Sequence, residues 1–247
     1  MKNLIHAELL KLRTTRMIYG LGLAALAIAP INAISAISNA GKSGGGPALT
    51  TAGGIRAVMA TSLFGGILVL VIGILIVAGE FRHNTATSTF LMSPHRGRVV
   101  AAKFAASAIV GGALALIASA VTLAVALPLL SAKHIRVDIF SHSVGMVLLG
   151  GIAAMTIYAT VGVGVGSLIR NQTAAVVIAL SWLLVVDGLL VSFAHEIGKW
   201  TPLGASAALS GQIGRFLPMW GGPVLFLAYG LAFAAAGTRF TMRRDVS

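Results

Sequence analysis

The sequence predicts an all-α protein that crosses a membrane six times. Of the 247 residues, 57% are hydrophobic and 10% are charged, whereas a typical soluble domain carries about 25% charged residues. The apolar residues form six continuous runs, most of them close to the roughly 20 residues that a helix needs to cross a bilayer. A β-barrel would require alternating polar and apolar residues, so these continuous runs favour helices, which satisfy their own backbone hydrogen bonds.

The six predicted spans leave no polar stretch long enough for a separate soluble domain. We therefore expect one transmembrane domain over residues 1–247. Small residues let membrane helices approach closely, so the 30 glycines agree with a packed helical bundle. The spans are expected at residues 17–38, 58–78, 104–130, 144–168, 173–194 and 222–237.

The positions of the basic residues predict the orientation of these spans. Twelve of the 18 lysines and arginines lie in segments that share a side with the N-terminus. Cytoplasmic loops carry the excess of positive charge, so both termini are predicted to be cytoplasmic. The basic residues lie at the ends of apolar runs, where lipid headgroups account for the net charge of +12. This placement argues against nucleic-acid binding, and the absence of cysteine excludes disulfides and thiol chemistry.

Residues 1–16 precede the first span and are predicted to form a helix in the membrane interface. Met1, Ile5, Leu9 and Leu12 would lie along one side of this helix, opposite basic residues. A plain basic flank is the alternative. A cleaved signal peptide is a third interpretation, but the first apolar run exceeds the 7–15 residues or so expected of its core.

Two connections on the predicted external side have distinct compositions. Residues 39–57 are rich in glycine and serine and are expected to form a flexible loop. The nearby stretch 36–43 resembles a phosphate-binding loop but lacks its first glycine. Residues 195–221 are apolar but interrupted by proline and glycine, with Trp200 and Trp220 near their ends. This second segment is expected to be a re-entrant external cap, with an interfacial loop as the alternative.

Few polar groups lie inside the predicted spans. Asp187 is the only charged residue well within one, and an acid there costs about 2.5–3.5 kcal/mol. It is a candidate for lining a pathway or gate, unless it lies near the outer end and reaches the interface. Thr122 and Thr156 are also pathway candidates, although bonding between helices is the commoner role of such residues. Gly162 and the alternate glycines that follow it predict close helix packing or a local bend.

The insert at residues 79–103 is polar and basic between two apolar runs. It carries Arg82, Arg96, Arg98 and Lys103, as expected of a surface that grips a cytoplasmic partner. Residues 85–93 combine hydroxyl side chains with an apolar group, and Pro94 would end a helix there. Such a short helix suits docking into an acidic groove. A solvated linker near the headgroups is the alternative.

These features together resemble the ABC transporter permeases of the type-2 exporter group. The likeness lies in Glu80 with the following FRHNTATSTFLMSP and HRGRVVAAK, in AELLKLRTTR at 7–16, and in RRDV at 243–246. It implies a bacterial cytoplasmic-membrane permease that works as a dimer, expected to be a homodimer with a heterodimer possible. It also implies two copies of a cytoplasmic ABC ATPase that bind ATP and Mg, and an interfacial helix at residues 2–16.

In that group, the loop between the second and third spans supplies a coupling helix that docks on the ATPase. Carried over to this chain, the helix would fall within 85–93, and the turn around Arg170 would be a second contact. The residues implied for ATPase coupling are Glu80, Arg82, Thr85, Thr87, Ser88, Phe90, Leu91, Arg96, Arg98 and Arg170.

The function expected from the sequence is the membrane subunit of an ATP-driven exporter, acting in efflux of a drug, antibiotic, lipid or glycan. No catalytic, cofactor-binding or metal-binding residue is predicted on this chain, so ATP hydrolysis is assigned to a partner. The alternative is an ion-coupled secondary transporter or channel. That class usually shows several intramembrane ionisable residues or related halves, whereas this sequence shows one acid and no obvious repeat.

Overall fold

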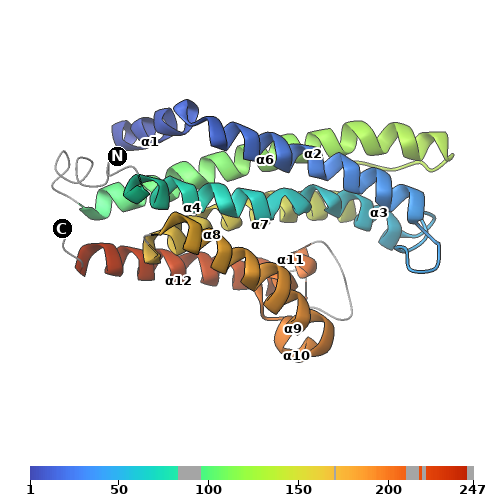
Figure 1. The fold of residues 1–247 in the computed structure, drawn as a ribbon. Coiled ribbons are helices and arrows are strands. Elements are labelled where there is room, and N and C mark those ends of the chain that lie inside the picture. The colour runs from blue at the N-terminus through green and yellow to red at the C-terminus, as the bar shows by residue number, and fades with distance from the viewer. Residues whose placement is uncertain (83–95, 170, 210–216, 219–220, 244–247) are drawn as a thin grey trace.

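The computed structural model describes residues 1–82, 96–169, 171–209, 217–218 and 221–243. Across these residues the chain is helical and contains no β-strand. The long helices lie side by side (Figure 1). The N-terminus, the end of α4 (Gly66–Arg82), the start of α6 (Arg96–Ala132) and the end of α12 (Gly221–Arg243) share one end of the bundle.

Five helical segments in the described part of the chain are long and apolar enough to cross a membrane. Three are single helices: α2 (Arg16–Asn39), α6 and α7 (His142–Leu168). The second span is continuous through α3 (Ala52–Met59), the 3₁₀ segment η1 (Ala60–Gly65) and α4. The fifth combines α8 (Gln172–Ser181), the π-helical turn η2 (Trp182–Val186) and α9 (Asp187–Phe193). The sixth predicted span falls within α12, and its passage through a membrane remains a prediction.

The connection between the first two spans is shorter than the sequence predicts. The flexible loop expected over 39–57 ends at Thr51, because α3 begins at Ala52. The Thr51 hydroxyl accepts a hydrogen bond of 3.1 Å from the Gly54 amide, which caps this helix. Pro30 and Pro128 lie inside the helices α2 and α6.

The apolar segment after the fifth span contains two short helices, α10 (His195–Gly198) and α11 (Pro202–Leu209). Pro202 occupies the first position of α11, where its missing amide proton costs no helical hydrogen bond. The Tyr229 hydroxyl of α12 donates a 2.7 Å hydrogen bond to the Trp200 carbonyl. The segment between the fifth span and α12 is thus tied to α12 before α11 begins.

Helix α7 is central and packs against α4, α6 and α12. Its closest approach is to α4, where a side chain at Gly73 or Gly162 would have no room. A Cβ atom at Gly73 would lie 2.1 Å from the Ala159 carbonyl oxygen, and one at Gly162 would lie 2.1 Å from the Leu70 carbonyl oxygen. Close packing is therefore the role of Gly162, and α7 continues unbroken through it.

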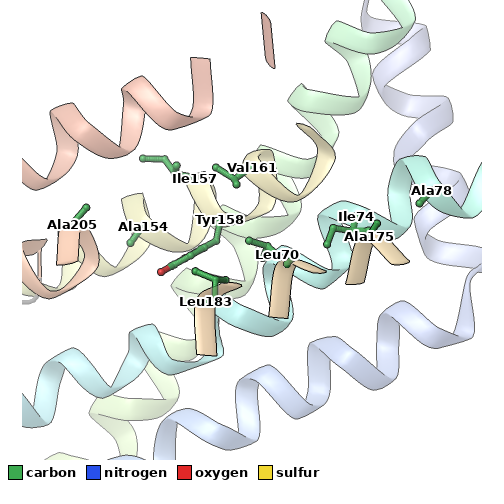
Figure 2. Packing of buried hydrophobic residues seen from close by; sticks show 11 residues of the cluster. Leu70, Ile74, Ala78, Ala154, Ile157, Tyr158, Val161, Ala175, Leu183 and Ala205 are labelled. Atoms are coloured by element: carbon green, nitrogen blue, oxygen red, sulfur yellow. The ribbon is translucent and has the colours of Figure 1, made fainter. Parts of the chain in front are cut away.

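The apolar core beside this contact gathers residues from distant parts of the sequence. Figure 2 shows Tyr158 of α7 among Leu70 of α4, Leu183 of η2 and Ala205 of α11. All four side chains are buried. The segment between the fifth span and α12 thus shares a core with the transmembrane helices.

Candidate functional site

Four charged side chains meet at the end of the bundle where α4 stops and α6 starts. Glu8 and Lys11 come from α1 (Lys2–Thr14), Glu80 from α4 and Lys103 from α6. The Lys103 ammonium lies 2.9 Å from Glu8 Oε2 and 2.7 Å from Glu80 Oε1. The Lys11 ammonium lies 2.9 Å from Glu8 Oε1 and 2.8 Å from Glu80 Oε1. Each cation contacts both acids, so the four groups form a closed ring without net charge, named here the charge cluster.

Most of the charge cluster is shielded from solvent. The exposed fractions of the side chains are 4% for Lys103, 6% for Glu8, 11% for Glu80 and 47% for Lys11. Taking a charged group out of water costs several kcal/mol unless a partner compensates it. The ion pairs of the ring supply that compensation. The charge cluster therefore links all three helices, α1, α4 and α6, to one another.

The docking of α1 explains how Glu8 becomes buried. Leu12 is buried against Ile72, Ile76 and Val77 of α4, with Leu9 packed at the edge of the same core. Glu8 lies one turn before Leu12 and so shares its inward side. The apolar side of the predicted N-terminal helix therefore packs against other helices of the chain. Met1, expected on the same stripe, is 58% exposed.

The two carboxylates of the charge cluster favour the charged form of the Lys11 side chain. Burial by itself lowers the pKa of Lys11, but hydrogen bonds and charge attraction from Glu80 and Glu8 outweigh it. The net result is a pKa above the ordinary value of 10.5. Lys11 therefore remains an ammonium throughout the neutral range.

A small cavity of about 20 Å³ adjoins the charge cluster between α4, α6 and α7. This is room for about one water molecule. Lys103, Glu80 and Ser167 provide its polar lining, together with Val77, Phe81, Val100 and Val163. A molecule larger than water does not fit in this cavity.

Only some of the predicted coupling residues lie in the part of the chain that the structure describes. Glu80 belongs to the charge cluster, and Arg98 is exposed near the start of α6. Lys103 was expected on a surface that grips a partner, but it is buried and paired within the chain. Outside the described residues lie Thr85, Thr87, Ser88, Phe90, Leu91 and Arg170, and the side chains of Arg82 and Arg96.

Sequence reasoning missed Glu8, Lys11 and Lys103 as members of a site. One signal was available: Glu8 falls on the same side of the helix as Leu12, and an acid on an apolar face needs a buried partner. The identity of that partner could not be read from the sequence. Lys103 lies 95 positions away from Glu8 in the chain.

Asp187 forms a second buried polar contact, at the start of α9 within the fifth span. Its residue exposure is 0%, so the carboxylate does not reach the surface of the chain. Its Oδ2 atom accepts a 2.9 Å hydrogen bond from the Leu203 amide in the first turn of α11. A helix N-terminus has unsatisfied amides and favours negative charge, so Asp187 caps α11. Its Oδ1 atom has no hydrogen-bond partner among the described residues.

The two threonine candidates lie within the helix packing. The Thr156 hydroxyl donates a 2.7 Å hydrogen bond to the Ile152 carbonyl of its own helix. Thr122 is fully buried on α6, and its hydroxyl makes no hydrogen bond within the described part of the chain. A pathway role for Asp187, Thr122 or Thr156 remains a prediction.

Comparison with known proteins identifies the family. The model of the ABC-2 family transporter proteins matches residues 4–186, from α1 and the charge cluster to the end of η2. No curated protein matches the chain. Membrane subunits of this family are transport components and not enzymes, and they generally work with a cytoplasmic ATPase. The chain therefore belongs to the ABC-2 family of transporters, as a multi-pass membrane permease.

Proposed function

We propose that this permease is the membrane subunit of an ATP-driven exporter and that the charge cluster passes force from the ATPase to the spans. A separate cytoplasmic ABC ATPase, present in two copies, binds ATP and Mg and hydrolyses the nucleotide. Two copies of the permease form the membrane part, as a homodimer or, alternatively, with a related second chain. The observation that carries the proposal is the closed ring of charges where α1, α4 and α6 meet.

The position of the charge cluster supports this role. The predicted coupling helix, within residues 85–93, lies in the sequence between the end of α4 and the start of α6. Glu80 and Lys103 lie near these two helix ends and contact each other directly. A push on the segment would therefore act on both helices at once. Separating them would break the ion pairs that the buried Lys103 makes with Glu8 and Glu80, so α1, α4 and α6 are expected to move together.

The movement can continue from α4 into the centre of the bundle. Gly73 and Gly162 bring the backbones of α4 and α7 into direct contact, without side chains that could yield between them. Packed interfaces of this kind shift between discrete arrangements instead of deforming continuously. Displacement of α4 would thus reach α7 and, through it, α12.

Transport is proposed to be outward, across a bacterial cytoplasmic membrane, with both termini of the permease in the cytoplasm. A drug, an antibiotic, a lipid and a glycan remain open as cargo. An ion-coupled secondary transporter or channel is the alternative. This alternative is less well supported, because Asp187 is the only charged residue well inside a predicted span. One of its carboxylate oxygens accepts a hydrogen bond from the first turn of α11.

Reconstitution with an ABC ATPase from the same source tests the proposal. ATP hydrolysis should increase when the ATPase is combined with the permease in lipid nanodiscs. Replacing both Phe90 and Leu91 with aspartate should remove the increase, because it would destroy the apolar anchor of the predicted coupling helix. Replacing the exposed Ser131, at the other end of α6, with aspartate is the control and should leave it intact. Equal hydrolysis with and without permease would contradict the proposal.

A further inference from the structure

Hydrogen bonds fix the backbone of the connection between α6 and α7 at both of its ends. At the end of α6, His134 adopts a left-handed conformation with φ of 59°. The His134 amide donates to the Ser131 carbonyl at 2.9 Å, and the Ile135 amide donates to the Leu130 carbonyl at 3.0 Å. This pair of bonds is the Schellman arrangement that closes a helix. Residues 133–141, named here the α6–α7 connector, therefore leave α6 in a defined direction.

The other end of the α6–α7 connector is held by Asp138. Its Oδ1 atom accepts a 3.0 Å hydrogen bond from the Phe140 amide. Its carbonyl accepts a 2.7 Å hydrogen bond from the Ser141 hydroxyl. Ser141 is the residue that precedes the first turn of α7. The backbone of Phe140 is thus fixed between two hydrogen-bonded residues.

Despite this fixed backbone, the side chain of Phe140 is 96% exposed. An apolar residue just before a helix cap often packs against the fourth residue of the helix. In α7 that residue is Gly145, which has no side chain to offer, and a Cβ atom there would meet nothing within 4 Å. Phe140 therefore lacks its usual partner and is presented outward.

The surroundings of Phe140 indicate what covers it. Lys133 and Arg136 are exposed on the same connector. The apolar run of α6 ends at Leu130 and that of α7 starts at Val144, so the connector lies where apolar spans meet the headgroups. Apolar rings placed at that level contact acyl chains, and nearby cations contact phosphate groups.

We propose that the α6–α7 connector is a lipid-binding element at the end of the bundle remote from the N-terminus. Phe140 inserts among the acyl chains just below the headgroups, and Lys133 and Arg136 bind the phosphates of anionic lipids. The proposal requires only that the chain spans a membrane. It is independent of the ATPase, so its failure would not bear on the exporter proposal.

Because the chain has no cysteine, a single nitroxide label can measure the depth of this site. Phe140→Cys would be labelled in vesicles of phosphatidylcholine with or without phosphatidylglycerol. Collisions with oxygen report lipid, and collisions with a water-soluble nickel chelate report solvent. Lys42→Cys on an exposed loop and Leu149→Cys on the exposed side of α7 provide the aqueous and lipid references.

The label at position 140 is expected to favour oxygen over nickel, as at 149, and to move deeper when phosphatidylglycerol is added. This deepening should disappear in a Lys133→Gln/Arg136→Gln background, while the basal depth remains. A label at 140 that collides with nickel as often as at Lys42→Cys would overturn the proposal. Protection from both reagents would also overturn it, because that result indicates cover by a second copy or another protein.

Discussion

Replacing Lys103 with methionine is expected to reduce the free energy of unfolding by about 3–5 kcal/mol. The substitution keeps a long side chain but leaves Glu8 and Glu80, at 6% and 11% exposure, with Lys11 as the remaining partner in the charge cluster. Both carboxylates would thus lose their ion pair with the buried ammonium of Lys103. The loss can be measured as the shift in denaturant-induced or thermal unfolding of the purified permease in detergent.

Lys11→Met is the matched control for this prediction. It removes a cation from the same two carboxylates, but Lys11 is 47% exposed and water already screens its charge. Its effect should be about 1 kcal/mol or less. Adding Glu80→Gln to Lys103→Met should recover part of the loss, because one of the two acids that lost their ion pair with Lys103 is then uncharged. Equal losses from Lys103→Met and Lys11→Met would show that burial of the cluster does not determine its importance.

Replacing Gly162 with alanine is expected to destabilise the bundle by about 1–3 kcal/mol. The new methyl group would lie 2.1 Å from the Leu70 carbonyl oxygen, and this backbone atom of α4 cannot rotate away. The helices α4 and α7 would have to separate, which also disturbs the core around Tyr158. Thermal unfolding in the same detergent would measure the change.

Gly20→Ala on α2 provides the control for the glycine prediction. A Cβ atom at Gly20 would meet nothing within 4 Å. Alanine there should be neutral or stabilise the helix by about 0.5–1 kcal/mol, because glycine is the poorer helix former. If Gly162→Ala proved as stable as Gly20→Ala, direct backbone contact would not explain the packing of α4 against α7.

The long helices were predictable because apolar runs of this length have few alternatives in a bilayer. Each of the five membrane-length segments contains a predicted span, apart from one terminal residue at Ala194. The start of α3 was missed because Gly53 and Gly54 read as loop residues, although Thr51 before them is a typical helix cap. The π-helical turn η2 left no mark in the apolar pattern, since its residues are ordinary for a span.

The candidate site was only partly predictable. Glu80 was singled out, but a count of charges assigned Lys103 to a surface, because counting cannot reveal pairing between distant helices. The burial of Lys103 depends on how α1 docks against α4 and α6, which is a property of tertiary packing. Asp187 was recognised as unusual. Its partner is the backbone amide of Leu203, and a backbone donor carries no sequence signature.

The most direct test of the account places a single cysteine at Ser88, in the middle of the predicted coupling segment. The otherwise cysteine-free permease would be treated with a membrane-impermeant maleimide, in intact cells and in inside-out vesicles, with and without the ABC ATPase. Labelling is expected only from the cytoplasmic side, together with protection by the ATPase and cross-linking to it. Labelling from outside the cell would contradict the predicted topology. Cytoplasmic labelling that no ATPase ever blocks would contradict the proposal that this segment receives force from ATP hydrolysis.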